Sequence, residues 1–291
     1  MTSSTDRLRE LIWRDEMLVV PGAADAVTAR IVESTGFPAV YVTGAGFANA
    51  SYGIPDVGLV SVDATVEHVR RICDVVGIPV IADADTGYGG VLNVARTVRQ
   101  LERAGAAAIQ IEDQTFPKRC GHFEGKTAIS VSEMKAKISA AVDSRDDAKL
   151  VLIARTDALA TEGLDAAVER GQEYAESGAD VIFVEAPTTY DELSVLPAKF
   201  DVPLLVNIVE GGKTPNLSAA ELQQMGFAIA LFANSALRVA IDAVTRALAE
   251  LYVSGTTAHI IGGMASFEDR QRLVGLPVFQ ALEDRYLGNQ R

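Results

Sequence analysis

Short apolar runs recur along the chain every few tens of residues, and this spacing constrains the fold more than any other feature of the sequence. The runs are rich in Val, Ile, Leu and Ala, which is typical of strands buried on both faces of a parallel sheet. They cover residues 18–21, 39–43, 79–83, 107–113, 150–157, 180–186, 203–208 and 228–233. Segments with helical spacing separate them; in residues 91–105, for example, Ala95, Val98 and Leu101 share one face.

Alternating strand and helix units of this number, in a chain of 291 residues, predict a closed (β/α)8 TIM barrel, a fold that takes roughly 250 residues. A doubly wound open sheet is the alternative. No Pro-rich joint or low-complexity linker divides the chain, so a single domain is expected over residues 1–291.

The last barrel helix is expected over residues 237–253, and a tail follows over residues 254–291. The tail carries apolar side chains that have no place inside a closed barrel: Phe267, Leu273, Leu276, Val278, Phe279, Leu282 and Tyr286. Because such a surface is unfavourable in water, we expect the tail to pack as helices on the barrel or on a second subunit.

The charge of the chain excludes several kinds of partner. Its formal net charge is -13, which repels nucleic-acid phosphates and anionic lipid, so neither is an expected partner. The sequence has two cysteines and no apolar stretch that suggests a secretory signal or a membrane span, so a cytoplasmic location is expected. An anionic substrate would need local positive charge from a metal, an arginine or helix N-termini.

Acidic side chains gather where two neighbouring strands are expected to end. Asp83 and Asp85 alternate along one strand end and should point the same way, and Glu112 lies at the equivalent end of the next strand. Carboxylates so close to one another need a cation, and hard oxygen ligands suit Mg²⁺ or Mn²⁺ better than Zn²⁺. The alternative is that these acids cap the helices that follow the strands.

Other polar side chains occupy comparable strand ends: Tyr41, Thr43, Arg155, Glu185 and Asn207. An arginine after an apolar run such as residues 151–154 is hard to explain as core. It is either paired with Glu185 or available to a substrate carboxylate. Residues Thr43, Gly44 and Ala45 could bring backbone N–H groups to a ligand, or form only a tight turn that needs glycine.

The segment over residues 117–126 is polar, basic and punctuated by glycine, as a mobile active-site loop is. Its Cys120 has Lys118, Arg119 and His122 as neighbours, which could lower the pKa of the thiol and let it exchange protons near neutrality. Zinc binding by Cys120 and His122 is a poor alternative, because the sequence offers no second ligand pair.

These residues resemble the motifs of the isocitrate lyase/phosphoenolpyruvate mutase superfamily over nearly the whole chain. The matching segments are residues 21–26, 41–46, 53–56, 83–89, 111–114, 118–122, 154–158 and 210–215. The resemblance implies that Asp83 binds Mg²⁺, with Asp85, Glu112 and Asp56 reaching the ion directly or through waters.

The resemblance also implies roles around the metal. Thr43, Gly44, Ala45, Arg155 and Asn207, together with Gly121, would hold an α-keto or α-hydroxy acid. Cys120 would be the general acid, a base would act near Tyr41, and His122 and Glu185 would complete the catalytic set.

Within the superfamily, the loop sequence Lys118–His122 favours cleavage of a carbon–carbon bond over that of a P–C bond. Methylisocitrate lyases have arginines where this chain has Phe123 and Phe267, so a tricarboxylate substrate is disfavoured. Residues 122–126 and 210–213 are more similar to the branch of 2,3-dimethylmalate lyase and oxaloacetate hydrolase. The leading hypothesis is cleavage of a 2-hydroxy dicarboxylate to pyruvate and a monocarboxylate.

Several alternatives stay open from the sequence. They are oxaloacetate hydrolysis to oxalate and acetate, a carboxyphosphonoenolpyruvate-type phosphonomutase, and a barrel that only binds small acids. Phe232–Ser235 departs from the sequence of both lyase branches at this point, which leaves the substrate undecided. The resemblance further implies a homotetramer, a dimer of dimers in which the C-terminal helices are exchanged between subunits.

Overall fold

The computed structural model describes residues 2–118 and 125–288. In this part of the chain, parallel strands follow one another around a closed barrel in the order of the sequence. The strands are β1 Leu18–Ala23, β2 Val40–Val42, β3 Val80–Asp83, β4 Ala108–Glu112, β5 Val151–Thr156, β6 Val181–Val184, β7 Leu204–Asn207 and β8 Ile229–Phe232. Each lies within or beside one of the apolar runs, so the (β/α)8 prediction is confirmed and the open-sheet alternative is wrong.

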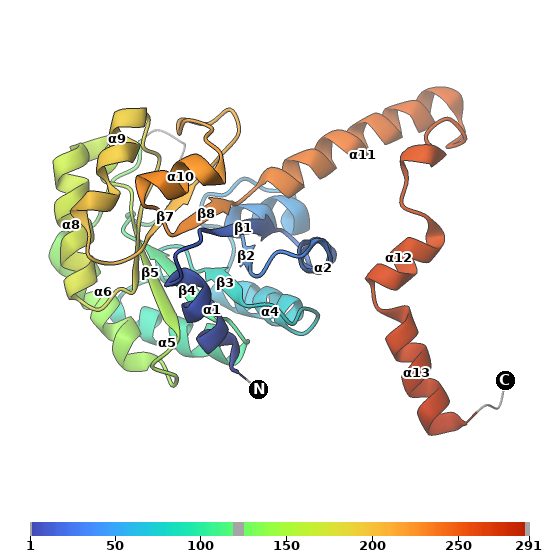
Figure 1. Ribbon diagram of the computed structural model, residues 1–291, viewed down its shortest axis with the longest axis horizontal. Coiled ribbons are helices and arrows are strands. Elements are labelled where there is room, and N and C mark those ends of the chain that lie inside the picture. Colours follow the sequence, from blue (N-terminus) through green and yellow to red (C-terminus); the bar gives the residue numbers. More distant parts are fainter. Residues whose placement is uncertain (1, 119–124, 289–291) are drawn as a thin grey trace.

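Helices connect the strands and surround the barrel (Figure 1). The α-helices are α1 Ser4–Ile12, α2 Ala26–Thr35, α3 Gly44–Phe47, α4 Val62–Cys73, α5 Val91–Arg103, α6 Val131–Ser144, α7 Leu159–Glu162, α8 Leu164–Glu176, α9 Tyr190–Val195, α10 Ala219–Met225, α11 Ser235–Ser254, α12 Phe267–Leu273 and α13 Leu276–Leu287. A π-helix, η1, covers Ala48–Tyr52, and 3₁₀ turns, η2 and η3, cover Pro197–Lys199 and Ile261–Gly263. None of the helices in the described residues is long and apolar enough to cross a membrane.

Helix ends follow the local sequence. Asp25 caps α2, because its Oδ1 accepts a hydrogen bond of 2.8 Å from the backbone N–H of Thr28. The same helix ends at Gly36, whose φ of 100° lies in the left-handed region that glycine enters without strain. Signals of this kind set the length of the connection between one strand and the next.

Alternation along the strands divides the apolar side chains into two layers. In β5, for example, Val151 and Ile153 belong to a cluster inside the barrel, whereas Leu152 and Ala154 pack between the barrel and its helices. The barrel interior is therefore filled with side chains, as in other barrels of this size. What matters for function is the last inward position of each strand, at its carboxyl end.

Helix α1 closes the opposite end of the barrel. Its Leu8 is 0% exposed and its Ile12 is 2% exposed, and both belong to the cluster of inward-facing strand residues. Ion pairs fix the helix there, since Arg9 Nη2 lies 2.6 Å from Asp180 Oδ1. The amino end of the barrel is thus covered by the N-terminal helix.

The C-terminal arm, defined as residues 235–288, differs from the rest of the molecule. It leaves the barrel along α11 and carries α12 and α13 away from the barrel body (Figure 1). None of its three helices has a buried residue. The arm contacts the barrel body at α2, where Arg30 Nη1 donates a hydrogen bond of 3.4 Å to the carbonyl of Leu273. The apolar tail predicted from the sequence therefore stays largely uncovered within one chain.

Candidate active site

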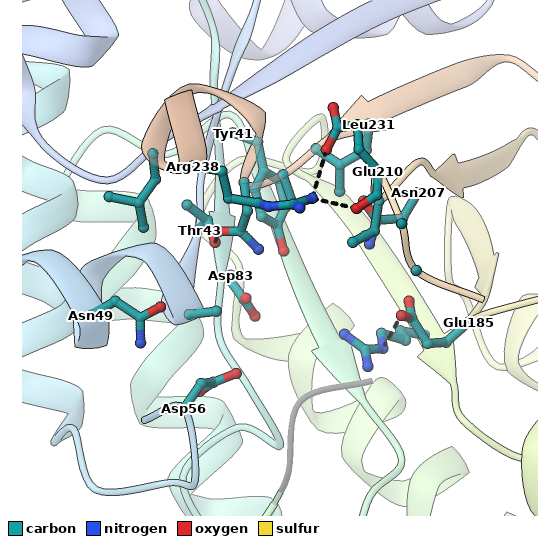
Figure 2. A pocket seen from close by; sticks show the side chains of 18 of the residues that line it. Tyr41, Thr43, Asn49, Asp56, Asp83, Glu185, Asn207, Glu210, Leu231 and Arg238 are labelled. Carbon is teal, nitrogen blue, oxygen red and sulfur yellow. Dashed lines mark hydrogen bonds and ion pairs between the residues drawn. The ribbon is translucent and has the colours of Figure 1, made fainter. Parts of the chain in front are cut away.

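A pocket of about 490 Å³ lies at the carboxyl end of the barrel. Several strands contribute polar residues that continue their inward-facing apolar rows: Tyr41, Asp83, Glu112, Arg155, Glu185 and Asn207. All of these except Glu112 line the pocket directly. In Figure 2, Asp56 and Asp83 lie on one side, while Glu185, Asn207 and Glu210 lie on the other. The predicted strand-end residues are therefore brought to one site.

Asp83 ends β3 and is fixed by its surroundings. Its Oδ2 accepts a hydrogen bond of 3.2 Å from the backbone N–H of Gly44, and its Oδ1 accepts one of 3.1 Å from that of Asp85. Tyr41 lines the same pocket as Asp83. Burial and the charge of Asp83 raise the pKa of Tyr41 well above its ordinary value, so the phenol is a donor here.

Asp85 reaches the site by a different route from the one predicted. It lies beyond the end of β3 and has a φ of 47°, so simple alternation along a strand does not describe it. It still converges with Asp83, because the turn folds its carboxylate back over the barrel end. Neither residue caps α5, whose N-cap is Gly90, and α6 is capped by Ser130. The helix-capping alternative for these acids is therefore wrong.

Lys118 lies at the centre of the acidic residues. Its Nζ is 2.5 Å from Asp56 Oδ1 and 2.6 Å from Asp85 Oδ1, and the residue is only 4% exposed. Burial lowers the pKa of Lys118, but Asp85, Glu112, Asp83 and Asp56 raise it well above its ordinary value. The side chain is thus an ammonium ion that balances part of the local negative charge.

The acidic set suits a divalent cation by its chemistry. Burial raises the pKa of Asp85 to about 6 and that of Glu112 well above its ordinary value, because a buried carboxylate is costly to ionise. The buried Oε1 of Glu112 receives no hydrogen bond from the described residues. In residues 2–118 and 125–288, however, no three His, Cys, Asp or Glu side chains converge as metal ligands. The Lys118 ammonium lies among them instead, at a place that needs positive charge.

Arg155 forms the opposite wall of the pocket. Its Nε and Nη2 each lie 3.0 Å from a carboxylate oxygen of Asp157, and its Nη1 lies 3.2 Å from Glu112 Oε2. Glu185 Oε2 is farther away, at 3.7 Å from Nε. The sequence suggested pairing with Glu185, but Asp157, which was not considered, is the principal partner.

The turn after β2 was expected to offer free backbone N–H groups to a ligand, but at least two of these groups already have partners within the protein. Thr43 caps α3, because its Oγ1 accepts a hydrogen bond of 3.1 Å from Gly46 N–H, and Gly44 N–H donates to Asp83. Thr43 and Ala45 line the pocket. Glycine at position 44 leaves room for the acidic residues, since a Cβ there would lie 3.0 Å from Asp83 Oδ2 and 3.4 Å from Asp85 Oδ1.

Sequence reasoning missed several pocket residues. Asn49 comes from the π-helix, and Arg238 comes from the first turn of α11, where its Nη1 donates to the carbonyl of Glu210 and lies 3.4 Å from Glu210 Oε2 (Figure 2). Arg238 could have been found from its place in the chain, because the first turn after β8 must lie at the rim. Nothing in the sequence pattern marks Asn49.

Other predicted residues cannot be placed in the pocket. Cys120, Gly121, His122 and Phe123 lie outside the described residues. Phe267 is on α12, is 73% exposed and does not line the pocket of its own chain. Asn207 does line it, and its buried Oδ1 accepts no hydrogen bond from the described part of the chain.

Comparison with known proteins agrees with this site. A sequence profile described as phosphoenolpyruvate phosphomutase matches residues 8–252. The 2,3-dimethylmalate lyase of Eubacterium barkeri is 43% identical over 96% of this chain and 97% of its own. A 2-methylisocitrate lyase of Aeropyrum pernix is also 43% identical, over 92% of this chain and 86% of its own.

Solved structures extend the similarity to the whole fold. An oxaloacetate acetylhydrolase in complex with 3,3-difluorooxalacetate superposes with a TM-score of 0.94 at 34% identity, over 100% of this chain and 99% of that one. A phosphonopyruvate hydrolase in complex with oxalate and Mg²⁺ has a TM-score of 0.88 at 33% identity, over 98% and 99%. The chain belongs to the isocitrate lyase/phosphoenolpyruvate mutase superfamily.

Proposed function

We propose that this protein is a Mg²⁺-dependent carbon–carbon lyase that cleaves a 2-hydroxy dicarboxylate of the 2,3-dimethylmalate or 2-methylmalate type. Its products would be pyruvate and a short monocarboxylate. One observation carries the proposal: two walls of different charge face one pocket. The acidic wall is Asp56, Asp83 and Asp85 around Lys118, and the arginine wall is Arg155 with Asp157 and Glu112. Such a pocket suits a small acid held between a metal and a guanidinium, and the named lyases among the relatives support this chemistry.

Asp83, Asp85, Glu112 and Asp56 are the proposed residues that hold Mg²⁺, with Mn²⁺ as a possible substitute. When bound, the ion would polarise the C2 oxygen of the substrate. The Lys118 ammonium, now between Asp56 and Asp85, would have to leave this position to admit the ion. The site therefore needs a positive charge, which either the Lys118 ammonium or the metal ion can supply.

Arg155 and Asn207 are the proposed anchors for the substrate's carboxylate and oxygen groups. The guanidinium of Arg155 has five N–H donors, and three are directed at Asp157 and Glu112, so one remains on each terminal nitrogen. Two such donors can bind a carboxylate in parallel. Arg238 at the rim supplies a second cation, which suits the second carboxylate of a dicarboxylate. Thr43, Gly44 and Ala45 would complete the binding surface.

Apolar side chains beside Arg238 favour an alkyl-substituted substrate. Leu231, Leu237 and Ile241 line the same pocket as the charged groups. Methyl substituents on a malate skeleton could be buried against these residues, where a third carboxylate would lose its hydration without a partner. This wall supports the dimethylmalate-like class over a tricarboxylate.

Proton transfers would be shared among groups that face the reacting carbons. Cys120 is the proposed general acid that protonates the departing acid, with Gly121 and His122 beside it in the chain. A base acting near Tyr41 would take the hydroxyl proton, and Glu185 is a further candidate in the pocket. Turnover by a Cys120→Ser variant at the wild-type rate would assign the acid to another residue.

An assay of pyruvate release tests the proposed function. Substituted malates, including 2,3-dimethylmalate and 2-methylmalate, are incubated with the protein with and without EDTA. We expect pyruvate from at least one of them and complete loss of turnover after chelation. Turnover that resists EDTA would contradict the metal role, and the absence of pyruvate from every substrate would contradict the lyase.

Oxaloacetate hydrolysis is the second candidate, favoured by the similarity to oxaloacetate acetylhydrolase over the whole chain. Oxalate formed from oxaloacetate, without pyruvate from the malates, would establish it. A ³¹P spectrum taken with a phosphonate substrate tests the phosphonomutase reaction in the same way.

The assembly proposed for this enzyme is a cytoplasmic homotetramer in which the C-terminal arm packs on a neighbouring subunit. The exposed side chains of the arm support it, since Tyr252, Val278, Phe279 and Leu282 are 43–92% exposed in the described part of the chain. Removal of residues 262–291 should yield smaller and less stable species in light scattering. An unchanged assembly would mean that the arm makes no subunit contact.

A further inference from the structure

Asp157 is the principal hydrogen-bond partner of Arg155 among the described residues. The Asp157 carboxylate accepts hydrogen bonds from both Nε and Nη2 of the guanidinium, so it lies in the plane of the arginine fork. Asp157 is 1% exposed, and burial raises its pKa, but Arg155 and Lys126 together bring the pKa below its ordinary value. The residue is therefore an anion fixed between two cations.

Lys126 is the second of these cations. Its Nζ lies 2.6 Å from Asp157 Oδ1, the same oxygen that accepts from Arg155 Nη2, and the lysine is 5% exposed. Arg155 has two further carboxylates nearby, with Glu112 Oε2 at 3.2 Å from Nη1 and Glu185 Oε2 at 3.7 Å from Nε. Lys126 adds a second cation to this group and so offsets part of the negative charge that an anionic substrate would meet.

The backbone around Lys126 fixes its position relative to Asp157. Thr115 N–H donates to the carbonyl of Thr127 at 2.8 Å, and Ile129 N–H donates to the carbonyl of Asp113 at 2.8 Å. The side chain of Asp113 in turn accepts hydrogen bonds from Asp157 N–H at 2.9 Å and from Thr156 Oγ1 at 2.7 Å. Asp113 thus joins the two segments, because its carboxylate binds the strand end that carries Asp157 and its backbone carbonyl binds the segment that follows Lys126.

Asp113 is itself fixed from the outer side of the barrel. Tyr174 donates its phenolic hydrogen to Asp113 Oδ2 at 2.8 Å, and Arg170 Nη1 lies 3.7 Å from the same oxygen. Arg170 is held in turn by Glu162 at 2.8 Å. These contacts make the support of Asp157 rigid, so a change at Lys126 should act on the carboxylate of Asp157 and not on its backbone.

We propose that Lys126 is a positioning residue that acts through Asp157 on Arg155, the proposed substrate-binding arginine. This inference rests on the proposed function only in assigning a carboxylate ligand to Arg155. Lys126 holds the Asp157 carboxylate in the plane of the guanidinium and offsets its negative charge. The two remaining N–H groups of Arg155 are thereby directed at the pocket with their positive charge preserved.

Calorimetric titration of the full-length protein with oxalate, in the presence of Mg²⁺, tests this role. Lys126→Met should bind oxalate about tenfold more weakly than the wild type. The variant no longer holds the Asp157 carboxylate, so Arg155 loses its fixed orientation towards the oxalate. Lys126→Gln keeps a donor and a stem of similar length and guards against a folding defect in the methionine variant. It should lie between the wild type and Lys126→Met. The affinity for Mg²⁺ alone should stay within about twofold, because the ion pair of Lys126 is with Asp157, on the side of the pocket that carries Arg155.

Lys135→Met is the matched control, because it also breaks a lysine–carboxylate ion pair, here with Glu173 on the partly exposed surface of α6. It should bind oxalate as the wild type does. In an Asp157→Asn background, Lys126→Met should cause no further loss, since its effect passes through that carboxylate.

Two results would overturn the inference. The first is oxalate binding by both Lys126 variants within twofold of the wild type, and the second is a full and additive loss in the Asp157→Asn background. These results are distinct from failure of the proposed lyase. A wild-type protein that binds oxalate but releases no pyruvate would refute the lyase and leave the Lys126 comparison valid. A wild-type protein that does not bind oxalate would overturn both.

Discussion

The two walls of the pocket solve the problem of buried charge in opposite ways. On the acidic wall, Asp56, Asp83 and Asp85 crowd around the ammonium of Lys118, and the negative charge is in excess. On the arginine wall, the charge of Arg155 is met by Asp157 and Glu112 at 3.0 and 3.2 Å. The first wall lacks cationic charge, whereas the second is already arranged around its own cation.

This difference suggests a division of labour. Crowded carboxylates whose counter-charge is carried by a lysine side chain could exchange that charge for a metal ion. A guanidinium held by fixed carboxylates is pre-organised and has only its free donors to offer. The acidic wall should therefore govern metal affinity, and the arginine wall should govern affinity for the acid.

The largest effect is expected when the acidic wall is broken at Asp83. Asp83→Ala should abolish detectable Mg²⁺ binding, and oxalate binding with it, and lower turnover on the order of 10³-fold, because metal ions supply several kcal/mol to such reactions. Calorimetry with each ligand and the pyruvate assay give the three values. Asp63→Ala, which removes an exposed carboxylate on α4, is the control. Retained Mg²⁺ affinity in Asp83→Ala would mean that the walls do not divide as proposed.

The next effect isolates the arginine wall. Arg155→Lys keeps the buried positive charge but loses the planar fork, so oxalate affinity should fall roughly 10- to 100-fold. Mg²⁺ affinity should change little, since the charge at this position is kept. Titration of each ligand separates the two, with the exposed Arg96→Lys as the matched variant. An equal loss of both affinities would show that the walls act as one unit.

A smaller effect of opposite sign is expected at Lys118. Lys118→Gln removes the ammonium that lies between Asp56 and Asp85, so Mg²⁺ should bind about tenfold more tightly. Calorimetric titration with Mg²⁺ alone measures this gain, and Lys149→Gln, at an exposed ion pair, should show none. Weaker Mg²⁺ binding in Lys118→Gln would make the lysine a partner of the ion and not its competitor.

The smallest effect concerns the support behind the acidic wall. His68 on α4 stacks on Phe47 with ring centroids 3.8 Å apart, and burial lowers the pKa of His68 from 6.5 to about 4. Between these values the unfolded chain binds more protons than the folded one, so stability falls as the pH drops from about 6.5 towards 4. At pH 5 the loss attributable to His68 should be up to about 2 kcal/mol.

Urea unfolding at pH 7 and pH 5 measures this dependence. The difference in the free energy of unfolding between the two pH values should be smaller in His68→Gln than in the wild type. The absolute stability of the variant does not enter the comparison. If the change in the free energy of unfolding between pH 7 and pH 5 is the same in both proteins, His68 does not contribute to the loss of stability at low pH.

The sequence was sufficient for the barrel because its signal repeats. Residues 79–83 were predicted as a strand and form β3 Val80–Asp83, and residues 107–113 contain β4 Ala108–Glu112. Buried parallel strands need continuous apolar runs, and few soluble segments have them without being strands. The polar residues at strand ends could be identified for the same reason, since an arginine or acid at the end of such a run needs a special explanation.

The sequence could not predict which residues these side chains contact. Lys118 and Lys126 are buried against Asp85 and Asp157, yet both come from a polar, glycine-punctuated segment with no periodicity that fixes the direction of a side chain. Asp85 turns back through a positive φ that alternation cannot predict. These contacts are set by the tertiary fold, and only the packing of distant segments determines them.

The N-terminal helix has a consequence for the order in which molecules leave the site. Because α1 covers the amino end of the barrel, entry and exit share the opening at the carboxyl end. If the proposed cleavage takes place there, both fragments leave through this opening. We expect the fragment nearer the opening to leave first and the one bound to Arg155 to leave second. In inhibition kinetics, the second fragment alone should then compete with the substrate for the free enzyme, while the first should lower the maximal rate as well.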